Sequence, residues 1–207
     1  MNDFFDEHYK EYDEWYIGNK FAYLSELEAV KKAIPEEGQG LEIGVGSGRF
    51  AAPLGITVGI DPSEKMIELA GERGVDARLG VGEHLLFDDG VFDYVALIVT
   101  ICFVRAPEKV LSESARVLKP GGKIIIGIID KESFLGKFYQ KKESIFYNRA
   151  RFFDVEEIEQ MLRAEGFEGF SYYQTIFRPP DELNDVENPR EGHGEGGFVV
   201  ISAAKPS

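Results

Sequence analysis

The sequence is poor in the residues that build disulfides, metal centres and membrane spans. Of its 207 residues, one is a cysteine, Cys102, and three are histidines. A single thiol excludes an intrachain disulfide, and no His or second Cys stands at metal-ligand spacing, so no metal is predicted. No apolar run approaches the roughly 20 residues of a membrane span, and the acidic first residues do not resemble a secretory signal. These absences predict a cytoplasmic protein that does not insert into a membrane.

Positive charge is also scarce. The 23 Lys and Arg residues face 37 Asp and Glu residues, which gives a formal net charge of −14 at pH 7. Nucleic acids and anionic membrane surfaces require clustered Lys and Arg, so neither is predicted as the main partner. The acidic excess would suit a cationic small molecule, although simple solvation of the surface also explains it.

What the sequence does contain is a glycine-rich loop within Leu41–Phe50. A short apolar run leads into Gly44, Gly46 and Gly48 at alternate positions. Glycine permits a positive φ and close approach of a ligand, and a strand entering such a loop before a helix presents free N–H groups. A dinucleotide fingerprint would need glycine at position 49, where the sequence has Arg49. The loop therefore indicates a different ligand-binding unit, or an ordinary glycine-rich turn.

Apolar strands alternate with amphipathic helices along most of the chain. The expected strands span residues 40–43, 56–60, 77–79, 92–99, 123–129, 170–177 and 198–204. Five alternations followed by a strand pair predict an α/β fold. We expect a doubly wound, Rossmann-like, mostly parallel seven-stranded sheet with an antiparallel edge strand and helices on both faces. Right-handed crossovers place the loops after the first four strands along one edge, where a ligand binds. Pro120–Gly122 is expected to form a turn before the fifth strand.

We predict a single domain with four parts. Residues 1–37 form an N-terminal helical cap, and residues 38–130 form the binding core. Residues 131–153 form an insertion or lid, and residues 154–207 form a C-terminal helix and strand pair. The cap and the insertion both concentrate aromatic residues, which could pack as core or roof a pocket. The loop 178–197 is long enough to be functional or mobile.

Asp61 directly follows the second expected strand. A carboxylate at the end of that strand can accept both hydroxyls of a ribose, and with the glycine loop nearby we favour this role. The alternative is a helix-starting acid, because Asp-Pro-Ser also begins helices.

Several motifs together resemble the class I methyltransferases that use S-adenosylmethionine (SAM). They stand in that family's order and rough spacing at Leu41–Gly48, Gly59–Asp61, Gly80–Phe87, Phe92–Val95 and Leu118–Gly122. The chain looks most like the small-molecule group that includes the ubiquinone and menaquinone C-methylation enzymes. The resemblance covers residues 38–130 firmly and extends weakly to residues 152–167.

The resemblance implies SAM as the cofactor and a small molecule as the methyl acceptor. It places Glu42 near the methionine amine, Asp61 on the ribose and Pro62 with Met66 beside the adenine. The full set of implied cofactor contacts is Glu42, Gly44, Val45, Gly46, Gly48, Asp61, Pro62, Met66, Gly82, Glu83 and Thr100. Thr100 and Ile101 would line the methyl-transfer site. Val81 departs from the family pattern, in which an Asp two residues before Glu83 accepts the adenine amino group.

Catalysis by this route needs alignment above all, and a base only when the nucleophile is protonated. The candidate bases are His84, Glu83, Tyr16 and Tyr139. We further predict that aromatic residues of the cap and the insertion roof the acceptor, namely Tyr12, Trp15, Tyr16, Phe138 and Tyr139. The rival hypotheses are a nicotinamide oxidoreductase and a SAM-binding or degenerate regulatory module without methyl transfer.

Overall fold

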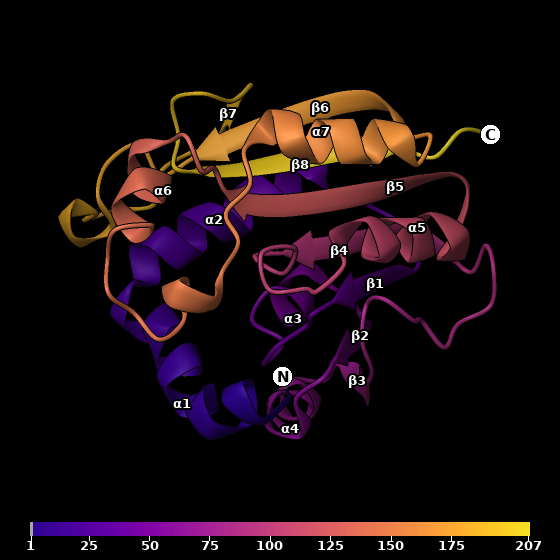
Figure 1. Cartoon of the computed structure of the whole chain (residues 1–207), viewed down its shortest axis with the longest axis horizontal. Coiled ribbons are helices and arrows are strands. Elements are labelled where there is room, and N and C mark those ends of the chain that lie inside the picture. Colours follow the sequence, from indigo (N-terminus) through magenta and orange to yellow (C-terminus); the bar gives the residue numbers. More distant parts are fainter. Residues whose placement is uncertain (1) are drawn as a thin grey trace.

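The computed structural model describes residues 2–207, so residue 1 of the predicted cap lies outside it. One sheet of eight strands runs through the molecule in the order β3-β2-β1-β4-β5-β8-β6-β7 (Figure 1). The strands are β1 (Gly40–Ile43), β2 (Val58–Asp61), β3 (Asp76–Leu79), β4 (Phe92–Ile98), β5 (Leu118–Ile129), β6 (Glu168–Thr175), β7 (Arg190–Glu191) and β8 (Phe198–Ala204). The helices are α1 (Asn2–Gly18), α2 (Lys20–Ala33), α3 (Ala51–Leu54), α4 (Glu64–Glu72), α5 (Pro107–Val117), α6 (Phe134–Tyr139), α7 (Val155–Ala164) and the 3-10 turns η1 (Tyr147–Arg149) and η2 (Pro180–Glu182).

The predicted fold class is confirmed. Strands β1 to β5 pair in parallel, and β8 and β6 add antiparallel partners beyond β5. The count differs from the expected seven because the two-residue strand β7 pairs with β6 through Tyr173 and Gln174. Its sequence lies in the long loop 178–197, where no apolar alternation marks a strand.

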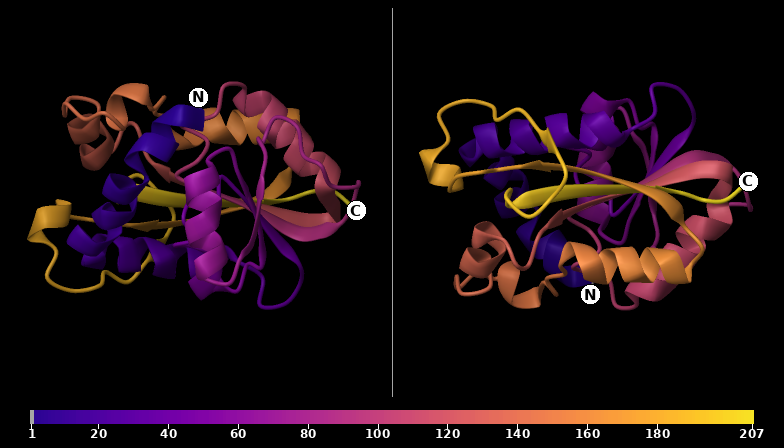
Figure 2. Two further views of the ribbon diagram at one scale, coloured as in Figure 1. Left: turned by 90° about the horizontal axis from the view of Figure 1, so that it is seen from below. Right: turned by 90° about the horizontal axis from the view of Figure 1, so that it is seen from above.

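Helices cover both faces of the sheet (Figure 2). On one face, α5 and α7 pack their apolar sides on β4, β5 and β8 around the fully buried Leu111 and Ile158. On the other face, α2 packs mainly on β6 and β8 and buries Val30, and Ala51 of α3 is buried in the same apolar cluster. The near-continuous apolar sequence of β4 follows from burial on both faces.

The predicted turn at Pro120–Gly122 is wrong. These residues lie within β5, whose pairing with β4 shifts register between the Phe92 and Tyr94 partners. The three residues form an irregularity in one continuous strand, with Gly121 at a φ of +75°. A bulge accommodates Pro and Gly because it interrupts the regular hydrogen-bond ladder.

The order β3-β2-β1-β4-β5 places a switch point between β1 and β4. From β1 the chain moves outward to β2 and β3, and then it returns to β4 on the other side. The crevice at the carboxyl ends of such strands is the ligand-binding place of open α/β sheets. Helix α1 and the segment with α6 and η1 lie at this end of the sheet (Figure 1).

The long loop 178–197 is packed against the body of the protein. Leu183 is buried, and the buried Glu187 carboxylate accepts hydrogen bonds from the Phe177 N–H and the Arg178 side chain. The Glu187 N–H donates to the Ser25 hydroxyl of α2 at 2.8 Å. Through this hydrogen bond the loop is attached to α2. Within residues 2–207, no helix combines the length and apolar character that crossing a membrane requires.

Candidate active site

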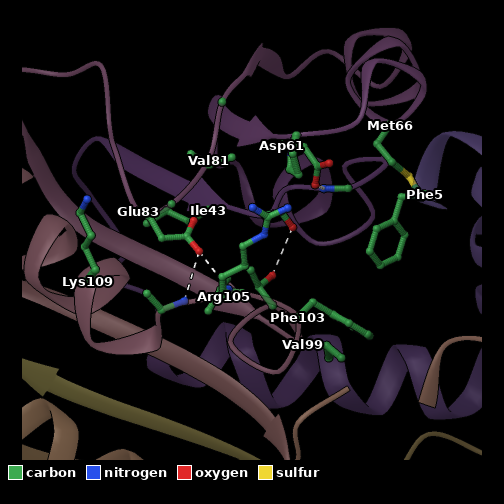
Figure 3. A pocket seen from close by; sticks show the side chains of 18 of the residues that line it. Phe5, Ile43, Asp61, Met66, Val81, Glu83, Val99, Phe103, Arg105 and Lys109 are labelled. Atoms are coloured by element: carbon green, nitrogen blue, oxygen red, sulfur yellow. Dashed lines mark hydrogen bonds between the residues drawn. The ribbon is translucent and has the colours of Figure 1, made fainter. Parts of the chain in front are cut away.

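A cavity of about 450 Å³ opens at the carboxyl ends of β1, β2 and β4 (Figure 3). Its size falls within the usual range for a small-molecule site. In the close-up, Asp61 and Met66 lie on the opposite side of the cavity from Val99 and Phe103. The residues of the predicted site that line it are Gly44, Gly46, Asp61, Pro62, Met66, Gly82, Glu83, Thr100 and Tyr12.

Asp61 is held by backbone N–H groups at the end of β2. One carboxylate oxygen accepts from Gly46 N and the other from Ser63 N, both at 2.9 Å. Burial raises the pKa of Asp61 to about 6, although these two hydrogen bonds oppose the shift. Each carboxylate oxygen can accept further hydrogen bonds, so the group is positioned to receive two hydroxyls from the cavity.

The glycines of the loop serve different purposes. A Cβ on Gly44 would lie 2.3 Å from the Thr100 methyl carbon, so glycine there lets the loop pack on the end of β4. Gly46 has a φ of +51°, and a Cβ would meet only the Tyr12 ring, at 4.0 Å. Gly46 therefore provides the conformation that turns its N–H toward Asp61 while it leaves the cavity open.

Glu42 lies beneath the same loop and is 1% exposed. Its Oε2 has no hydrogen-bond partner among the residues that the structure describes. Burial, and then the charge of Asp61, raise the pKa of Glu42 well above its usual value. A backbone hydrogen bond from Ala51 opposes this shift in part. The unpaired Oε2 remains costly, and a cationic ligand group would relieve that cost. The methionine end of SAM carries an ammonium group, so this observation fits the predicted cofactor.

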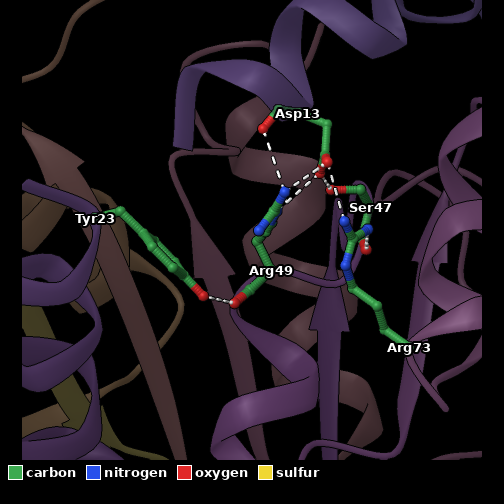
Figure 4. Close-up of polar contacts among 5 residues, drawn as sticks. All are labelled: Asp13, Tyr23, Ser47, Arg49 and Arg73. Carbon is green, nitrogen blue, oxygen red and sulfur yellow. Dashed lines mark hydrogen bonds and ion pairs between the residues drawn. The ribbon is translucent and has the colours of Figure 1, made fainter. Parts of the chain in front are cut away.

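A second acid fastens α1 to the glycine loop. Asp13 accepts hydrogen bonds from Ser47 Oγ at 2.5 Å, from Arg49 Nε and Nη2 at 2.9 and 2.6 Å, and from Arg73 Nη2 at 3.0 Å (Figure 4). Tyr23 of α2 donates to the Arg49 carbonyl at 2.5 Å. Burial alone would raise the pKa of Asp13, but these hydrogen bonds and the Arg charges lower it to about 2.

Asp6 makes a parallel attachment to the start of α4. Its carboxylate accepts from Ser63 Oγ at 2.6 Å and from Lys65 N at 3.0 Å. Sequence analysis missed both acids. No sequence signal identifies the pair, because their spacing of seven residues spans a kink in α1 at His8, where φ is −114° and ψ is 17°.

A smaller cavity of about 40 Å³ adjoins the larger one, and Val99 and Phe103 line both. Val99 has a φ of +52°, which is a rare conformation for a β-branched residue, and its N–H donates to the Gly127 carbonyl at 2.9 Å. Ile101, Tyr147 and other apolar residues complete the smaller cavity. Strained backbone of this kind gathers at functional sites, and here it stands where the two cavities meet.

Comparisons with known proteins agree with this geometry. The family model for a methyltransferase domain matches residues 41–126. An uncharacterized protein from Methanocaldococcus jannaschii is 48% identical over 97% of this chain and 98% of its own length. A solved Thermotoga maritima structure, described as a SAM-dependent methyltransferase and possible histamine N-methyltransferase, is 50% identical. It covers 99% of both chains with a TM-score of 0.96.

The chain belongs to the SAM-dependent methyltransferases. The same fold is also seen with SAM bound in phosphoethanolamine N-methyltransferase 2 from Haemonchus contortus. That structure has a TM-score of 0.69 at 21% identity and covers all of this chain and 60% of its own. Because the chain belongs to the SAM-dependent methyltransferases, SAM is its cofactor, as predicted. Membership in this family favours methyl transfer over the two rival hypotheses, a nicotinamide oxidoreductase and a module that only binds SAM.

Besides the buried Glu42, two predicted contacts of this methyltransferase lie outside the cavity lining. Val45 is buried under the loop, where a Cβ on Gly59 would lie 2.6 Å from the Val45 Cβ. Gly48 faces α4, and a Cβ there would lie 3.1 Å from the Ala70 Cα. Both residues therefore shape the loop from behind. Ile101 lines the smaller cavity and not the larger one.

The part of the cavity wall that contains Val81 and Glu83 differs from the family pattern. Val81 lines it and is 42% exposed. The Glu83 carboxylate is turned away to accept hydrogen bonds from Arg105 N at 2.9 Å and Ala106 N at 3.4 Å, and it thereby holds the loop before α5. Arg105 and Lys109 also line this side, and sequence analysis did not select either of them.

The predicted roof of the acceptor site is only partly reproduced. Of its five residues, Tyr12 alone lines the larger cavity, together with Phe5 and Phe103. Phe138 is 54% exposed, and Tyr139 stacks on Tyr147 with ring centroids 4.2 Å apart. The insertion instead reaches the cap through Phe146, whose ring centroid lies 5.6 Å from that of Tyr12 and 6.3 Å from that of Phe5.

Trp15 and Tyr16 lie behind Tyr12. The Tyr16 hydroxyl donates to the Tyr12 hydroxyl at 3.2 Å, and the Trp15 and Tyr16 rings meet edge to face. His84, another candidate base, is exposed and outside the cavity lining. Among the described residues, none of the predicted bases except Glu83 lines the cavity, and the Glu83 carboxylate is occupied by backbone N–H groups.

Proposed function

We propose that this methyltransferase transfers the methyl group of SAM to the nitrogen of a small amine with a flat, apolar body. The observation that carries this proposal is the joining of two cavities at Val99 and Phe103. The larger one holds the predicted cofactor residues. The smaller one, of about 40 Å³, is lined by apolar and aromatic side chains and has room for only part of an acceptor whose body lies in the larger cavity.

The roles of the chain's residues are binding and alignment. SAM, when bound, supplies a methyl group that is already activated on a sulfonium. Asp61 would hold the ribose, and Glu42 would pair with the methionine ammonium. The end of β4 at Thr100 would face the reacting centre. Alignment of the acceptor with the methyl group can contribute on the order of 7–11 kcal/mol, so position is the main demand on the protein.

An amine suits the cavity wall better than a phenol or a quinol. A phenolic acceptor must lose its proton, which requires a free base beside it. Within the described chain, the acids that line the cavity are Asp61 and Glu83, and backbone N–H groups occupy both. Deprotonation of an ammonium gives a neutral nucleophile, which burial favours, whereas deprotonation of a phenol gives an anion, which burial and acidic surroundings disfavour. The net charge of −14 also favours a cationic substrate.

The solved relative from Thermotoga maritima supports nitrogen as the accepting atom, because its description names an N-methyltransferase. The finer resemblance to ubiquinone and menaquinone C-methylation enzymes stays a prediction, and carbon is the rival accepting atom. The cytoplasmic location and the exclusion of nucleic acid as a substrate also stay predictions.

A matched panel of acceptors tests the proposal. The protein is incubated with SAM that carries a deuterated methyl group and, in separate reactions, with 2-phenylethylamine, histamine, 4-ethylphenol or a quinol of similar size. We expect mass spectrometry to place the label on the amine nitrogen, and the Asp61→Ala variant to lose the reaction. Label on a phenol oxygen or a ring carbon, with the amines unreacted, would contradict nitrogen as the acceptor.

A further inference from the structure

Three aromatic rings form one side of the larger cavity, and none of them belongs to the predicted cofactor contacts. They are Phe5 and Tyr12 of α1 and Phe103, which follows β4. In the close-up, Phe5 and Phe103 lie on the side of the cavity away from Lys109 (Figure 3). Segments that are far apart in the sequence therefore bring three rings to one wall of the site.

The three rings meet nearly at right angles. The ring centroids of Phe5 and Tyr12 are 5.6 Å apart with an interplanar angle of 86°, and those of Phe5 and Phe103 are 5.4 Å apart with an angle of 85°. Phe146 is not part of the cavity lining, but its ring contacts Phe5 and Tyr12 with centroids 6.3 and 5.6 Å away. The rings are thus supported as adjoining walls of an aromatic corner.

This corner adjoins the place where the two cavities meet. Phe103 lines both cavities, and its N–H donates to the Thr100 carbonyl at the end of β4 at 2.9 Å. Tyr12 faces the glycine loop, because a Cβ on Gly46 would lie 4.0 Å from its ring. The rings therefore lie between the proposed position of the cofactor and the proposed position of the acceptor.

The larger cavity offers a bound cation no free carboxylate. Among the described residues, the charged side chains of the lining are Asp61, Glu83, Arg105 and Lys109, two of each sign. Both acids already accept hydrogen bonds from backbone N–H groups. A positive charge that forms at the aromatic corner is therefore stabilised mainly by the faces of the rings.

Aromatic faces suit a quaternary ammonium ion better than a primary one. The quaternary ion has no N–H groups, and its positive charge is spread over methyl groups that contact the negative face of a ring. A primary ammonium has three N–H groups, and each is costly to bury without an acceptor. Of the three rings only Tyr12 carries a hydroxyl, which already accepts a hydrogen bond from Tyr16. The corner therefore matches a fully substituted nitrogen.

We propose that Phe5, Tyr12 and Phe103 form an aromatic cage for the ammonium group of the acceptor, and that the preferred acceptor is a tertiary amine, which becomes a quaternary ammonium ion. This inference rests on the proposed N-methylation. It adds the chemical class of the acceptor: an amine whose nitrogen already carries three carbon substituents.

The step balances without a base from the protein. A tertiary amine loses its proton to solvent before it binds, and its nitrogen lone pair then forms the N–C bond while the C–S bond breaks. The electron pair of the broken bond stays on sulfur, which becomes a neutral thioether. The positive charge passes to nitrogen, and no proton is released. Because this charge develops during the transfer, rings that face the nitrogen stabilise the transition state as well as the product.

A methylation series tests the class of acceptor. The acceptors are 2-phenylethylamine, its N-methyl form and its N,N-dimethyl form, and kcat/KM is corrected for the fraction of neutral amine. It should rise along the series by about tenfold, with trimethyl(2-phenylethyl)ammonium as the end product in mass spectrometry. If the primary amine reacts fastest and the dimethyl form does not react, the tertiary-amine class is wrong and N-methylation stands.

Direct binding tests the cage without turnover. Calorimetry in the presence of S-adenosylhomocysteine compares trimethyl(2-phenylethyl)ammonium with its uncharged isostere, in which a carbon atom replaces the nitrogen. The two ligands have nearly the same shape and differ in charge, so the cation should bind about tenfold more tightly. Equal affinities would show that the site binds the shape and not the charge, which would overturn the cage.

Ring substitutions assign the preference for the cation to individual residues. Phe5→Leu and Phe103→Leu remove a ring but keep an apolar side chain, so each should weaken binding of the cation about 3- to 30-fold and change binding of the isostere little. Tyr12→Phe keeps the ring and should keep the preference for the cation. The matched control is Phe134→Leu, which changes an aromatic residue of α6 outside both cavity linings and should have no effect. Equal losses for both ligands would mean that the rings serve packing alone.

The rival ligand of the rings is the sulfonium of SAM, which is also a cation. SAM carries this charge and S-adenosylhomocysteine does not, so the ratio of their affinities reports on it. We expect the ratio to be unchanged in Phe5→Leu and Phe103→Leu. A reduced ratio, together with wild-type affinity for the quaternary ion, would assign the rings to the cofactor and overturn the proposal.

The outcomes separate this inference from the proposed function. If the wild type methylates amines but the ring variants bind the quaternary ion as well as the wild type does, the cage is wrong and N-methylation stands. If the wild type methylates no amine, N-methylation fails and the tertiary-amine acceptor fails with it.

Discussion

Two acids attached to the glycine loop and one buried acid of α2 have opposite surroundings. Around the glycine loop, Asp61 and Asp13 have partners for both carboxylate oxygens. On α2, the buried Glu26 has no hydrogen bond or positive charge among the described residues that acts against the effect of burial on its pKa. A partnered acid fixes geometry, whereas an acid without such partners is governed by its burial.

The pKa values of Asp13 and Glu26 are shifted in opposite directions. Hydrogen bonds from Arg49 and Ser47 lower the pKa of Asp13 to about 2 against the effect of burial. Burial without opposition raises the pKa of Glu26 to about 8. Both side chains lie in the N-terminal 37 residues, so their surroundings, and not their place in the chain, decide the difference.

Removing the Asp61 carboxylate should have the largest effect on cofactor binding, because this side chain lines the larger cavity at the end of β2. We expect Asp61→Ala to weaken S-adenosylhomocysteine binding by about 1.5–3 kcal/mol, which is roughly 10- to 150-fold, through loss of charged hydrogen bonds. Calorimetry measures it directly. The control is Asp76→Ala, which removes an exposed acid paired with Arg78 on β3 and should leave affinity unchanged. Equal losses in the two variants would show that Asp61 does not bind the ribose.

Asp13→Ala should have the next largest effect, and it should appear in stability. Removing the shared partner of Arg49 and Arg73 should lower the free energy of unfolding by about 1–3 kcal/mol. This loss is smaller than the loss for a fully buried ion pair, because Asp13 is partly exposed. The folded pKa of Asp13 is depressed, so its contribution is present above the ordinary pKa of 3.8 and is lost as the pH falls toward about 2. Urea unfolding at several pH values should show the difference between variant and wild type shrinking over that range. A constant difference would mean that the charge of Asp13 is not what holds α1.

A third prediction concerns the pH dependence of cofactor binding. Because burial raises the pKa of Asp61 to about 6, the carboxylate that we expect to accept the ribose hydroxyls becomes protonated below that pH. Affinity for S-adenosylhomocysteine should fall about tenfold between pH 7 and pH 5. Asp61→Asn should bind more weakly at pH 7 and show a flatter profile. If the variant keeps the wild-type pH dependence, another group, such as Glu42, is responsible.

The cofactor half was largely predictable from the sequence for a physical reason. Its residues belong to strand–loop–helix units in which each ligand-facing group lies within a few positions of a strand end, as with Gly46 and Asp61. The parallel sheet then brings these ends together. What could not be predicted was the attachment by Asp13, because Arg49 and Arg73 lie 36 and 60 residues away from it.

The acceptor half was less predictable because tertiary packing alone creates it. Phe5, Tyr12 and Phe103 carry no motif, and their convergence depends on how α1 docks at the end of the sheet. The sequence selected aromatic residues of the cap and the insertion as a roof. Of these, Tyr12 lines the larger cavity and Phe138 is exposed, while Phe5 and Phe146 were not selected. Aromatic content alone cannot say which side of a short helix faces inward.

The smallest expected effect is at Val81, where the cofactor half departs from its family. We expect Val81→Asp to tighten S-adenosylhomocysteine binding by about 1 kcal/mol, because a carboxylate there can accept the adenine amino group. Arg105 and Lys109 line the same side of the cavity and would lower the cost of burying the new charge. The inosine analogue of the ligand, which lacks that amino group, should gain nothing, and Val81→Ala separates loss of the valine contact from gain of the acceptor. An equal gain for both ligands would mean that the new charge acts through Arg105 and Lys109. No gain for either would mean that adenine is held here by apolar contact with Val81 and Met66.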